Sequence, residues 1–150
     1  MIIRKATQKD LNIIQQLNNE LFELELEHFD TYLTKNWPLS KQGYDFFENA
    51  ITNDLVLVAQ IDDNVVGYLH ASKADIPYYD FEIAELCNMC ITKTYRKQGI
   101  GKNLYDEFVS YYNSQSVNHF IVTASYKNES AQAFYKKLGF KPANITYINF

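Results

Sequence analysis

The spacing of apolar residues changes along this chain, and the change limits the folds that it can adopt. Between Leu11 and Leu24 the apolar side chains recur every three or four positions, which is the period of one helix face. Over residues 54–61 and 65–74 they are nearly continuous, as in buried strands, with the turn residues 62–64 between the two runs. A chain that contains both patterns belongs to the mixed α/β class.

Turn and cap residues divide the rest of the chain. Asn128 can cap a helix that ends before Gly139, because a glycine suits the left-handed residue after a helix, and Pro142 prevents its continuation. The length of 150 residues is typical of one domain, so residues 1–150 are expected to form a single domain. The predicted order is strand 2–5, a helix over 11–24, a loop over 29–41, helix 42–52, strands 54–61, 65–74 and 82–92, helix 100–111, strand 119–125, a helix from 128 to 138 and strand 143–149.

Charge, apolar runs and cysteine count all weigh against several classes of protein. Lys and Arg number 14 against 18 Asp and Glu, a formal net charge of −4, whereas nucleic-acid binders of this size are usually basic. No apolar run approaches the ~18 residues of a membrane span, and the first residues lack the charge-then-apolar order of a signal peptide. The 2 Cys are too few for a disulfide scaffold. We therefore expect a soluble cytoplasmic protein without a nucleic-acid or membrane partner.

The segment from Arg96 to Lys102 carries the strongest chemical signal. Gly99 and Gly101 allow a tight turn after a strand and direct several backbone N–H groups to one point at a helix start. The helix dipole adds partial positive charge there, and basic residues 93, 96, 97 and 102 surround the turn without an acid among them. The segment predicts a phosphate or pyrophosphate site. The alternative is a basic turn whose glycines only shape the chain.

The same segment resembles the phosphate loop of the GNAT superfamily of N-acetyltransferases, which reads Arg or Gln-x-x-Gly-x-Gly or Ala. Here it is Arg96-Lys97-Gln98-Gly99-Ile100-Gly101, after a strand that contains Met89-Cys90-Ile91. The run from Asn128 to Phe140 is similar to the family's Asn-x-x-Ala-x-x-Phe-Tyr-x-x-x-Gly-Phe block. The resemblance extends over almost the whole chain. It implies a central, mostly antiparallel mixed β-sheet that splays at the cofactor cleft and is flanked by about four helices.

The resemblance also implies acetyl-CoA as co-substrate. Backbone groups of Met89 and Ile91 would pair with the pantetheine arm like an added strand, and the amides of residues 97–102 would hold the pyrophosphate. Asn128 would approach the pantetheine or the pyrophosphate, and Tyr135 would place its phenol near the thioester sulfur. The implied cofactor-binding residues are Met89, Cys90, Ile91, Arg96, Lys97, Gln98, Gly99, Ile100, Gly101, Lys102, Asn128 and Tyr135.

Transfer from a thioester to an amine needs a neutral amine, a stabilised oxyanion and a protonated or solvated thiolate. The backbone N–H of Ile91 is the candidate oxyanion donor. The Tyr135 phenol is the candidate acid that protonates the thiolate. The alternative is that Tyr135 is only an aromatic residue of the core. Glu85 is the candidate base, since an even spacing puts its side chain on the same strand face as that of Ile91. Glu82, Asp80 or a water relay are alternatives, as is a Glu85 that only faces solvent.

Histidine and cysteine are not assigned to catalysis. His28, His70 and His119 are scattered, so surface or packing roles are predicted for all three. Cys87 and Cys90 have a spacing that puts their thiols on opposite faces of a strand, and no second Cys pair exists to complete a zinc site. No metal is therefore expected.

Acids and aromatic residues indicate the acceptor. Five acids lie within residues 20–30 and four within 75–85, without Lys or Arg in either stretch, and aromatic residues lie among them. Carboxylates among aromatic rings suit a cationic acceptor, such as a polyamine, an aminoglycoside-like amine or a basic peptide end. A solvated helix face is the alternative. The candidate acceptor-binding residues are Phe29, Tyr32, Tyr79 and Glu82.

Four further interpretations stay open. The same fold can serve as a non-catalytic acyl-CoA sensor, or as a protein or peptide N-acetyltransferase. The basic segment around Arg96 also allows a nucleic-acid binder, against which the net charge counts. Finally, the apolar tail residues Tyr147, Ile148 and Phe150 suit a contact between two copies of the chain, which predicts a homodimer.

Overall fold

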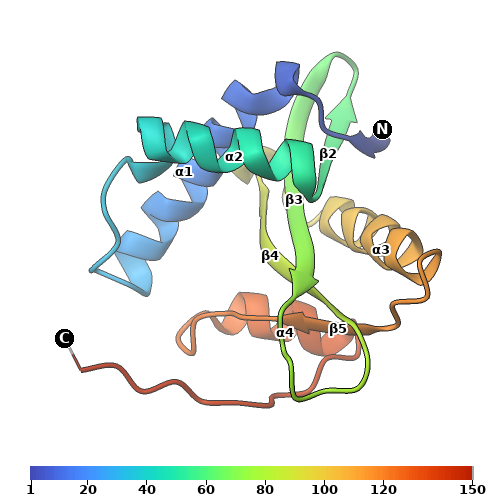
Figure 1. The fold of residues 1–150 in the computed structure, drawn as a ribbon. Coiled ribbons are helices and arrows are strands. Elements are labelled where there is room, and N and C mark those ends of the chain that lie inside the picture. Colours follow the sequence, from blue (N-terminus) through green and yellow to red (C-terminus); the bar gives the residue numbers. More distant parts are fainter. Residues whose placement is uncertain (150) are drawn as a thin grey trace.

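The computed structural model describes residues 1–149 and contains one five-stranded sheet with helices on both faces (Figure 1). The strands lie side by side in the order β1–β2–β3–β4–β5. Neighbours from β1 to β4 are antiparallel, and β5 runs parallel to β4. This confirms the predicted mixed, mostly antiparallel sheet. The strands are β1 (Ile2–Lys5), β2 (Leu55–Ile61), β3 (Asn64–Ala74), β4 (Ile83–Ile91) and β5 (His119–Val122).

The helices divide between the two faces of the sheet. α1 (Leu11–His28) and α2 (Lys41–Asn53) cover one face, and α3 (Ile100–Asn113) covers the other. α4 (Glu129–Lys137) follows β5 and packs Tyr135 against the α3 side. Three short 3-10 helices, η1 (Gln8–Asp10), η2 (Trp37–Leu39) and η3 (Lys93–Tyr95), connect these elements.

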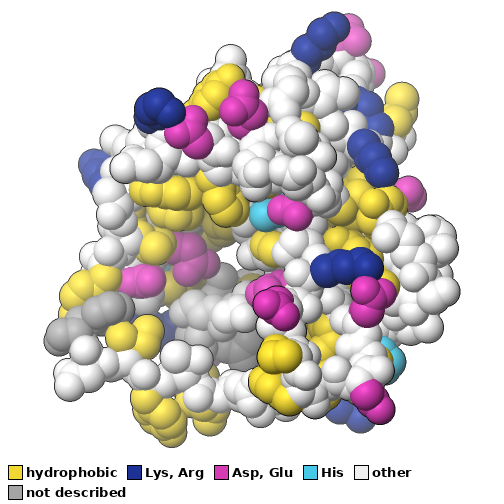
Figure 2. Space-filling model, viewed as in Figure 1, with side chains coloured by type: hydrophobic (Ala, Val, Ile, Leu, Met, Phe, Trp, Pro, Cys, Tyr) yellow, Lys and Arg dark blue, Asp and Glu magenta, His cyan; other side chains and the backbone are white. Residues whose placement is uncertain are grey.

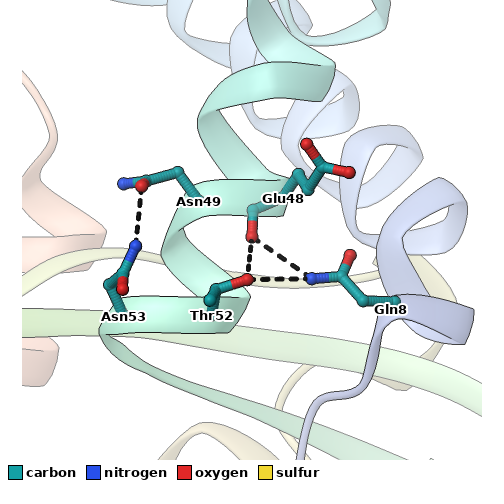
Figure 3. Close-up of a pocket in the computed structure, with 5 residues that line it drawn as sticks. All are labelled: Gln8, Glu48, Asn49, Thr52 and Asn53. Atoms are coloured by element: carbon teal, nitrogen blue, oxygen red, sulfur yellow. Dashed lines mark hydrogen bonds between the residues drawn. The ribbon is translucent and has the colours of Figure 1, made fainter.

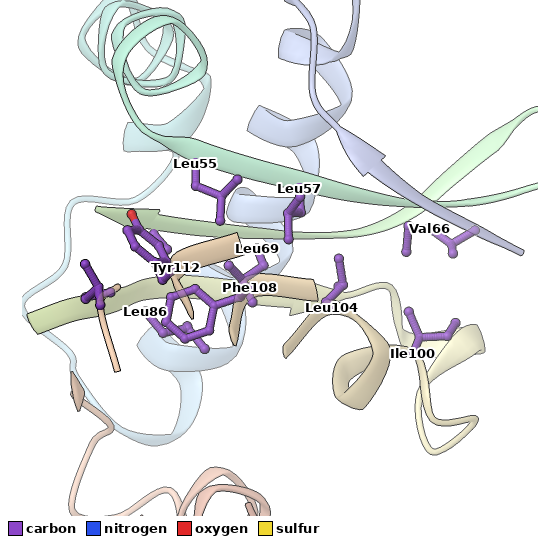
Figure 4. Packing of buried hydrophobic residues seen from close by; sticks show 13 residues of the cluster. Leu55, Leu57, Val66, Leu69, Leu86, Ile100, Leu104, Phe108 and Tyr112 are labelled. Carbon is purple, nitrogen blue, oxygen red and sulfur yellow. The ribbon is translucent and has the colours of Figure 1, made fainter. Parts of the chain in front are cut away.

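Each face has its own apolar core. On the α3 side, Leu104 and Phe108 are fully buried against leucines of β2, β3 and β4 (Figure 4). On the opposite side, Ile14 of α1 and Phe47 of α2 pack with Tyr68 of β3. The three- and four-residue spacing within α1 and α3 produces these stripes, as predicted. Two cores separated by one sheet fix both the outer helices and the strand register.

The cap residues of α4 also behave as predicted. The Asn128 Oδ1 accepts a hydrogen bond from the Ala131 amide at 3.0 Å, which satisfies one of the free amides of the first turn. After the helix, Gly139 has a φ of 94°, which is the left-handed conformation that favours glycine. The segment between β5 and Phe140 therefore has its predicted helix in its predicted position.

The end of the chain differs from the prediction. Residues 143–149, predicted as a strand, have no strand structure, and β5 ends at Val122 instead of residue 125. The tail side chains Ile145, Tyr147 and Ile148 are exposed. The tail composition favours a strand, but a strand needs a partner that supplies hydrogen bonds. Phe150, the last residue of the predicted dimer contact, lies outside the described residues.

One partly buried ion pair gives a prediction about acid stability. The Arg4 guanidinium holds Asp10 in two hydrogen bonds, of 2.8 and 2.9 Å, and the Thr7 amide donates a third at 2.8 Å. The Arg4 hydrogen bonds lower the pKa of Asp10 from 3.8 to about 2. Because this pKa is lower in the folded state, the stabilisation is present above pH 3.8 and is lost as pH falls toward 2.

We therefore expect Asp10→Asn to lower the free energy of unfolding by about 2 kcal/mol at neutral pH and to have little effect near pH 2. Urea unfolding of both proteins across this pH range measures the difference. Parallel pH curves for wild type and variant would show that the Arg4–Asp10 pair does not contribute.

Candidate active site

β4 and β5 separate partway along their length and form a fork. They pair from Ile83 opposite His119 to Leu86 opposite Val122, and within residues 1–149 no strand covers the outer edge of β4 beyond that point. The Thr92 amide donates to the Val66 carbonyl of β3 at 3.0 Å. Since hydrogen-bonded residues alternate in an antiparallel pair, the backbone groups of residues 89 and 91 point to the open edge instead. This edge can pair with an extended ligand.

The glycine turn continues from the open edge into α3. Gly99 has a φ of 83° and Lys97 a φ of 62°, both left-handed, and α3 begins at Ile100. The first helical hydrogen bond in α3 runs from the Asn103 amide to the Gly99 carbonyl at 3.1 Å. The amides of residues 100–102 therefore have no partner within the helix. Free amides at the start of a helix can bind an anion, and the sequence predicts an anion site at this turn.

Two of the predicted cations are already bound to the protein. The Arg96 Nε donates to the Ile91 carbonyl at 2.7 Å, which ties the turn to the end of β4. The Lys102 ammonium pairs with Asp106 one turn along α3. Lys93 and Lys97 are exposed. The groups of the turn that could bind an anion are therefore its backbone amides, together with these two exposed lysines.

Gly101 lies where the three predicted segments meet. A Cβ atom at this position would lie 3.5 Å from the Phe134 Cζ of α4 and 3.7 Å from the Met89 Cε of β4. The strand, the turn and α4 are therefore adjacent in space, although almost 50 residues separate Met89 from Phe134 in the chain. The fold brings together the segments that the sequence assigns to one ligand.

The two predicted residues of α4 differ in what they contact. Asn128 caps its helix with Oδ1 and donates from Nδ2 to the Glu25 carboxylate of α1 at 3.5 Å, so it bridges α4 and α1. Tyr135 packs against the α3-side core and contacts the rings of Phe134 and Phe140. Burial raises the pKa of Tyr135 to about 12. Its phenol is therefore protonated throughout the neutral range and can donate a proton.

The predicted alignment of Glu85 with Ile91 is wrong. His70 of β3 lies opposite Asn88 and Ala71 opposite Leu86, so Cys87 is an extra residue in β4, a β-bulge. Ala84 and Leu86 are buried in the α3-side core, and Glu85 between them therefore faces α1 and α2. Ile91, beyond the bulge, packs on the α3 side. The bulge reverses the alternation, so the two side chains lie on opposite faces of the sheet.

The four acids of α1 differ in their burial and in their hydrogen-bond partners. Glu20 accepts from the Thr92 hydroxyl at 3.0 Å, and Glu23 accepts from the Asn19 amide at 3.0 Å. Glu27 is exposed beside His28. Glu25 is half-buried beside Asn128, and burial raises its pKa. Glu20, Glu23 and Glu27 are three and four residues apart and share one helix face, whereas Glu25 lies on another face, so the four acids do not form one patch.

The candidate acceptor residues lie in two separate segments. Phe29 and Tyr32 follow α1, whereas Tyr79 and Glu82 lie in the connection between β3 and β4. Glu82 forms an ion pair with Lys73 at 2.7 Å, so its charge is compensated. Tyr79 stacks on Phe81, which stacks on the ring of His119 at the start of β5. Figure 2 shows acidic and hydrophobic side chains around a hollow between the α1–α2 layer and the part that contains α4.

The sequence prediction missed a histidine–aspartate pair. His70, predicted to have only a surface or packing role, is 3% exposed, and its Nε2 lies 2.9 Å from the Asp54 Oδ2. A second buried polar chain runs beside it, from the Asn18 amide to the Tyr68 hydroxyl and on to Asn88, over 2.7 and 2.6 Å. The available signal was a histidine within an otherwise apolar strand, since a buried polar group needs a partner.

A separate surface pocket of about 330 Å³ lies between η1 and α2 (Figure 3). Its lining amides bond to one another or to α2, as when Asn53 donates to Asn49 at 2.7 Å. No residue of β4, α3 or α4 lines it. Within residues 1–149, no helix is long and apolar enough to span a membrane, and no group of acidic, His and Cys side chains is arranged to hold a metal ion.

Known proteins similar to this chain share its fold. An uncharacterized N-acetyltransferase of Methanocaldococcus jannaschii is 27% identical over 146 residues, which cover 97% of this chain and 81% of that protein. A solved tetramutant of the BH1408 protein from Bacillus halodurans has a TM-score of 0.86 at 23% identity, over 99% of both chains. A predicted acetyltransferase from Clostridium acetobutylicum, solved with acetyl-CoA, has a TM-score of 0.80 at 19% identity, over 99% of this chain and 95% of that one.

The family match includes the elements that build the fork. Residues 15–140 match the acetyltransferase (GNAT) family, a span that contains β4, the glycine turn and α4. The open strand edge and the free amides of the turn fit an extended ligand that carries phosphates. The chain therefore belongs to the GNAT family of acetyltransferases, whose co-substrate is acetyl-CoA.

Proposed function

We propose that this protein transfers an acetyl group directly from acetyl-CoA to a primary amine on a small cationic molecule such as a polyamine. The observation that carries the proposal is the open edge of β4, which begins at the fork and leads to the glycine turn. Met89 and Ile91 would pair with the pantetheine arm, and the amides of residues 100–102 would hold the pyrophosphate. The acetyl end of an arm bound in this way would lie at the fork, near Cys87.

The two faces of the fork differ in chemistry, which suggests how the transfer proceeds. Tyr135 packs on the α3 side, and Glu85 faces the α1–α2 side. An amine that enters from the α1–α2 side would meet carboxylates, while the departing thiolate would be protonated by Tyr135 from the other side. The Ile91 amide, which points to the open edge, is the candidate donor to the oxyanion.

The α1–α2 side also supports a cationic acceptor. A row of rings runs from Phe22 through Trp37 to Phe46, with centroids 5.8 Å apart at both steps, and ends 5.6 Å from the ring of His70. Phe46 is exposed despite these contacts. The exposed Phe46 ring, which contacts the His70 partner of Asp54, suits an ammonium group, since such a group is attracted to both ring faces and carboxylates.

A panel of amines tests the proposal. Polyamines, aminoglycosides, amino acids and peptide N-termini are incubated with acetyl-CoA, and release of the CoA thiol is measured. We expect the polyamines to give the highest kcat/KM. Highest turnover with peptide N-termini would favour a peptide N-acetyltransferase instead. Tight acetyl-CoA binding without turnover of any amine would identify a sensor and contradict the proposal.

A further inference from the structure

The buried His70 has one nitrogen without a partner. Its Nε2 lies 2.9 Å from the Asp54 Oδ2, and its Nδ1 is buried with no hydrogen bond to any residue in the described chain 1–149. When Nε2 carries the proton that it donates to Asp54, the Nδ1 presents a lone pair. A buried acceptor without a donor costs stability. A ligand that donates a hydrogen bond at this point would remove that cost.

The position of His70 relates it to the fork. Its neighbours along β3, Leu69 and Ala71, are buried in the α3-side core, so His70 faces α1 and α2, as Glu85 does. It lies opposite Asn88 of β4, directly beside the bulge at Cys87. The fork opens at this bulge, because β4 and β5 are last paired at Leu86.

Several groups lie near His70. The carboxylate of Asp54, the residue just before β2, contacts its Nε2, α2 contributes the uncharged ring of Phe46 at 5.6 Å, and Glu85 of β4 lies on the same face of the sheet. Burial, followed by the charges of Glu85 and Asp54, raises the pKa of Cys87. The Glu85 and Asp54 carboxylates therefore both affect the pKa of the thiol at the bulge. Among these groups, only His70 has one nitrogen bonded to a carboxylate and a second, basic nitrogen without a bond to the described residues.

We infer that His70, held by Asp54, is the base that accepts a proton from the acceptor amine. The inference rests on the proposed function and assigns a residue to one of its steps. The ammonium loses one proton to the His70 Nδ1, and the neutral amine forms a C–N bond to the acetyl carbon as the C–S bond breaks. The second proton from the amine nitrogen balances the departing thiolate, through Tyr135. The sum is an acetamide, a CoA thiol and one proton.

The remaining proton has a route to solvent. Asp54, the partner of the His70 imidazole, has a side chain that is 28% exposed, whereas that of His70 is 4% exposed. An aspartate in this position orients the ring and stabilises the imidazolium. Water at the exposed edge of the pair can then carry the proton away.

Replacing His70 by glutamine tests its role as a base separately from its role in packing. In His70→Gln the side-chain amide can still donate to Asp54, but no basic nitrogen remains. We expect kcat to fall by about 10²-fold at neutral pH, with an unchanged KM for acetyl-CoA. The rate should recover as pH rises toward the pKa of the amine itself, since solvent then supplies neutral amine. His28→Gln, an exposed change on α1, is the matched control and should keep the wild-type profile.

Glu85→Gln tests the competing base. If His70 is the base, this variant keeps the low-pH limb of the wild-type rate profile, and His70→Gln shifts the limb to higher pH. A shifted limb in Glu85→Gln together with a wild-type profile in His70→Gln would overturn the inference. A wild-type enzyme that turns over no amine would contradict the proposed function instead, so the two failures are distinguishable.

A measurement on the wild type tests the inference even if the His70→Gln variant does not fold. With ¹⁵N-labelled histidine, the Nδ1 signal of His70 should shift when 1,4-diaminobutane is added without acetyl-CoA, because the ammonium donates to that nitrogen. An Nδ1 signal that stays unchanged at saturating diamine would show that His70 does not contact the amine.

Discussion

Replacing Gly101 by Asp should raise the Kd for acetyl-CoA by about 10³-fold. Gly101 lies in the first turn of α3, where the amides of residues 100–102 have no partner within the helix. A carboxylate at this position can accept from those amides itself and repels a pyrophosphate. Two unit charges about 4 Å apart interact by about 4 kcal/mol at an effective dielectric constant of about 20. That energy corresponds to a ~10³-fold increase in Kd, which titration calorimetry measures.

Gly101→Ala is the control for this prediction. An added Cβ would make only ordinary contacts, 3.5 Å from the Phe134 Cζ and 3.7 Å from the Met89 Cε. Alanine also suits a helix better than glycine, so the fold should be no less stable. We expect Gly101→Ala to bind acetyl-CoA nearly as tightly as the wild type. Equal losses in both variants would mean that space at Gly101 matters and charge does not.

The elements with local signals were predictable from the sequence. The helical spacing from Leu11 to Leu24, the cap at Asn128 and the glycine at 139 each act within a few residues, and the structure has all three. The absence of a strand at 143–149 was not predictable, because composition indicates only that a segment can form a strand. Whether it does so depends on a neighbour with free hydrogen-bonding groups.

The candidate site was predictable only in part, for a related reason. The glycine turn and its free amides follow from residues 96–102 alone. The direction of Glu85 does not, because one extra residue at Cys87 reverses every side chain beyond it, and no property of Cys87 reveals a bulge. The His70–Asp54 pair joins β3 to the residue just before β2, and their proximity follows from the register of the β2–β3 hairpin. Sequence spacing could not indicate that contact.

Tyr135→Phe should lower kcat by about 10²-fold and leave the Kd for acetyl-CoA nearly unchanged. The change removes only the phenol oxygen, while the ring contacts with Phe134 and Phe140 remain. Burial raises the pKa of Tyr135 to about 12, so the phenol stays protonated over the range in which an amine becomes neutral. Tyr135 should therefore cause no loss of rate on the alkaline side until pH approaches 12.

Tyr105→Phe is the matched control, because Tyr105 is a partly buried tyrosine of α3 that also contacts the Phe140 ring, at 5.9 Å. It loses the same oxygen atom outside the fork, so its kcat should equal that of the wild type. Thiol release gives kcat, and calorimetry gives the Kd for acetyl-CoA. A fall in kcat confined to Tyr135→Phe, at constant Kd, assigns the loss to protonation of the thiolate, since a packing defect would weaken binding as well. Wild-type turnover in Tyr135→Phe would instead leave solvent as the proton donor and remove Tyr135 from the reaction.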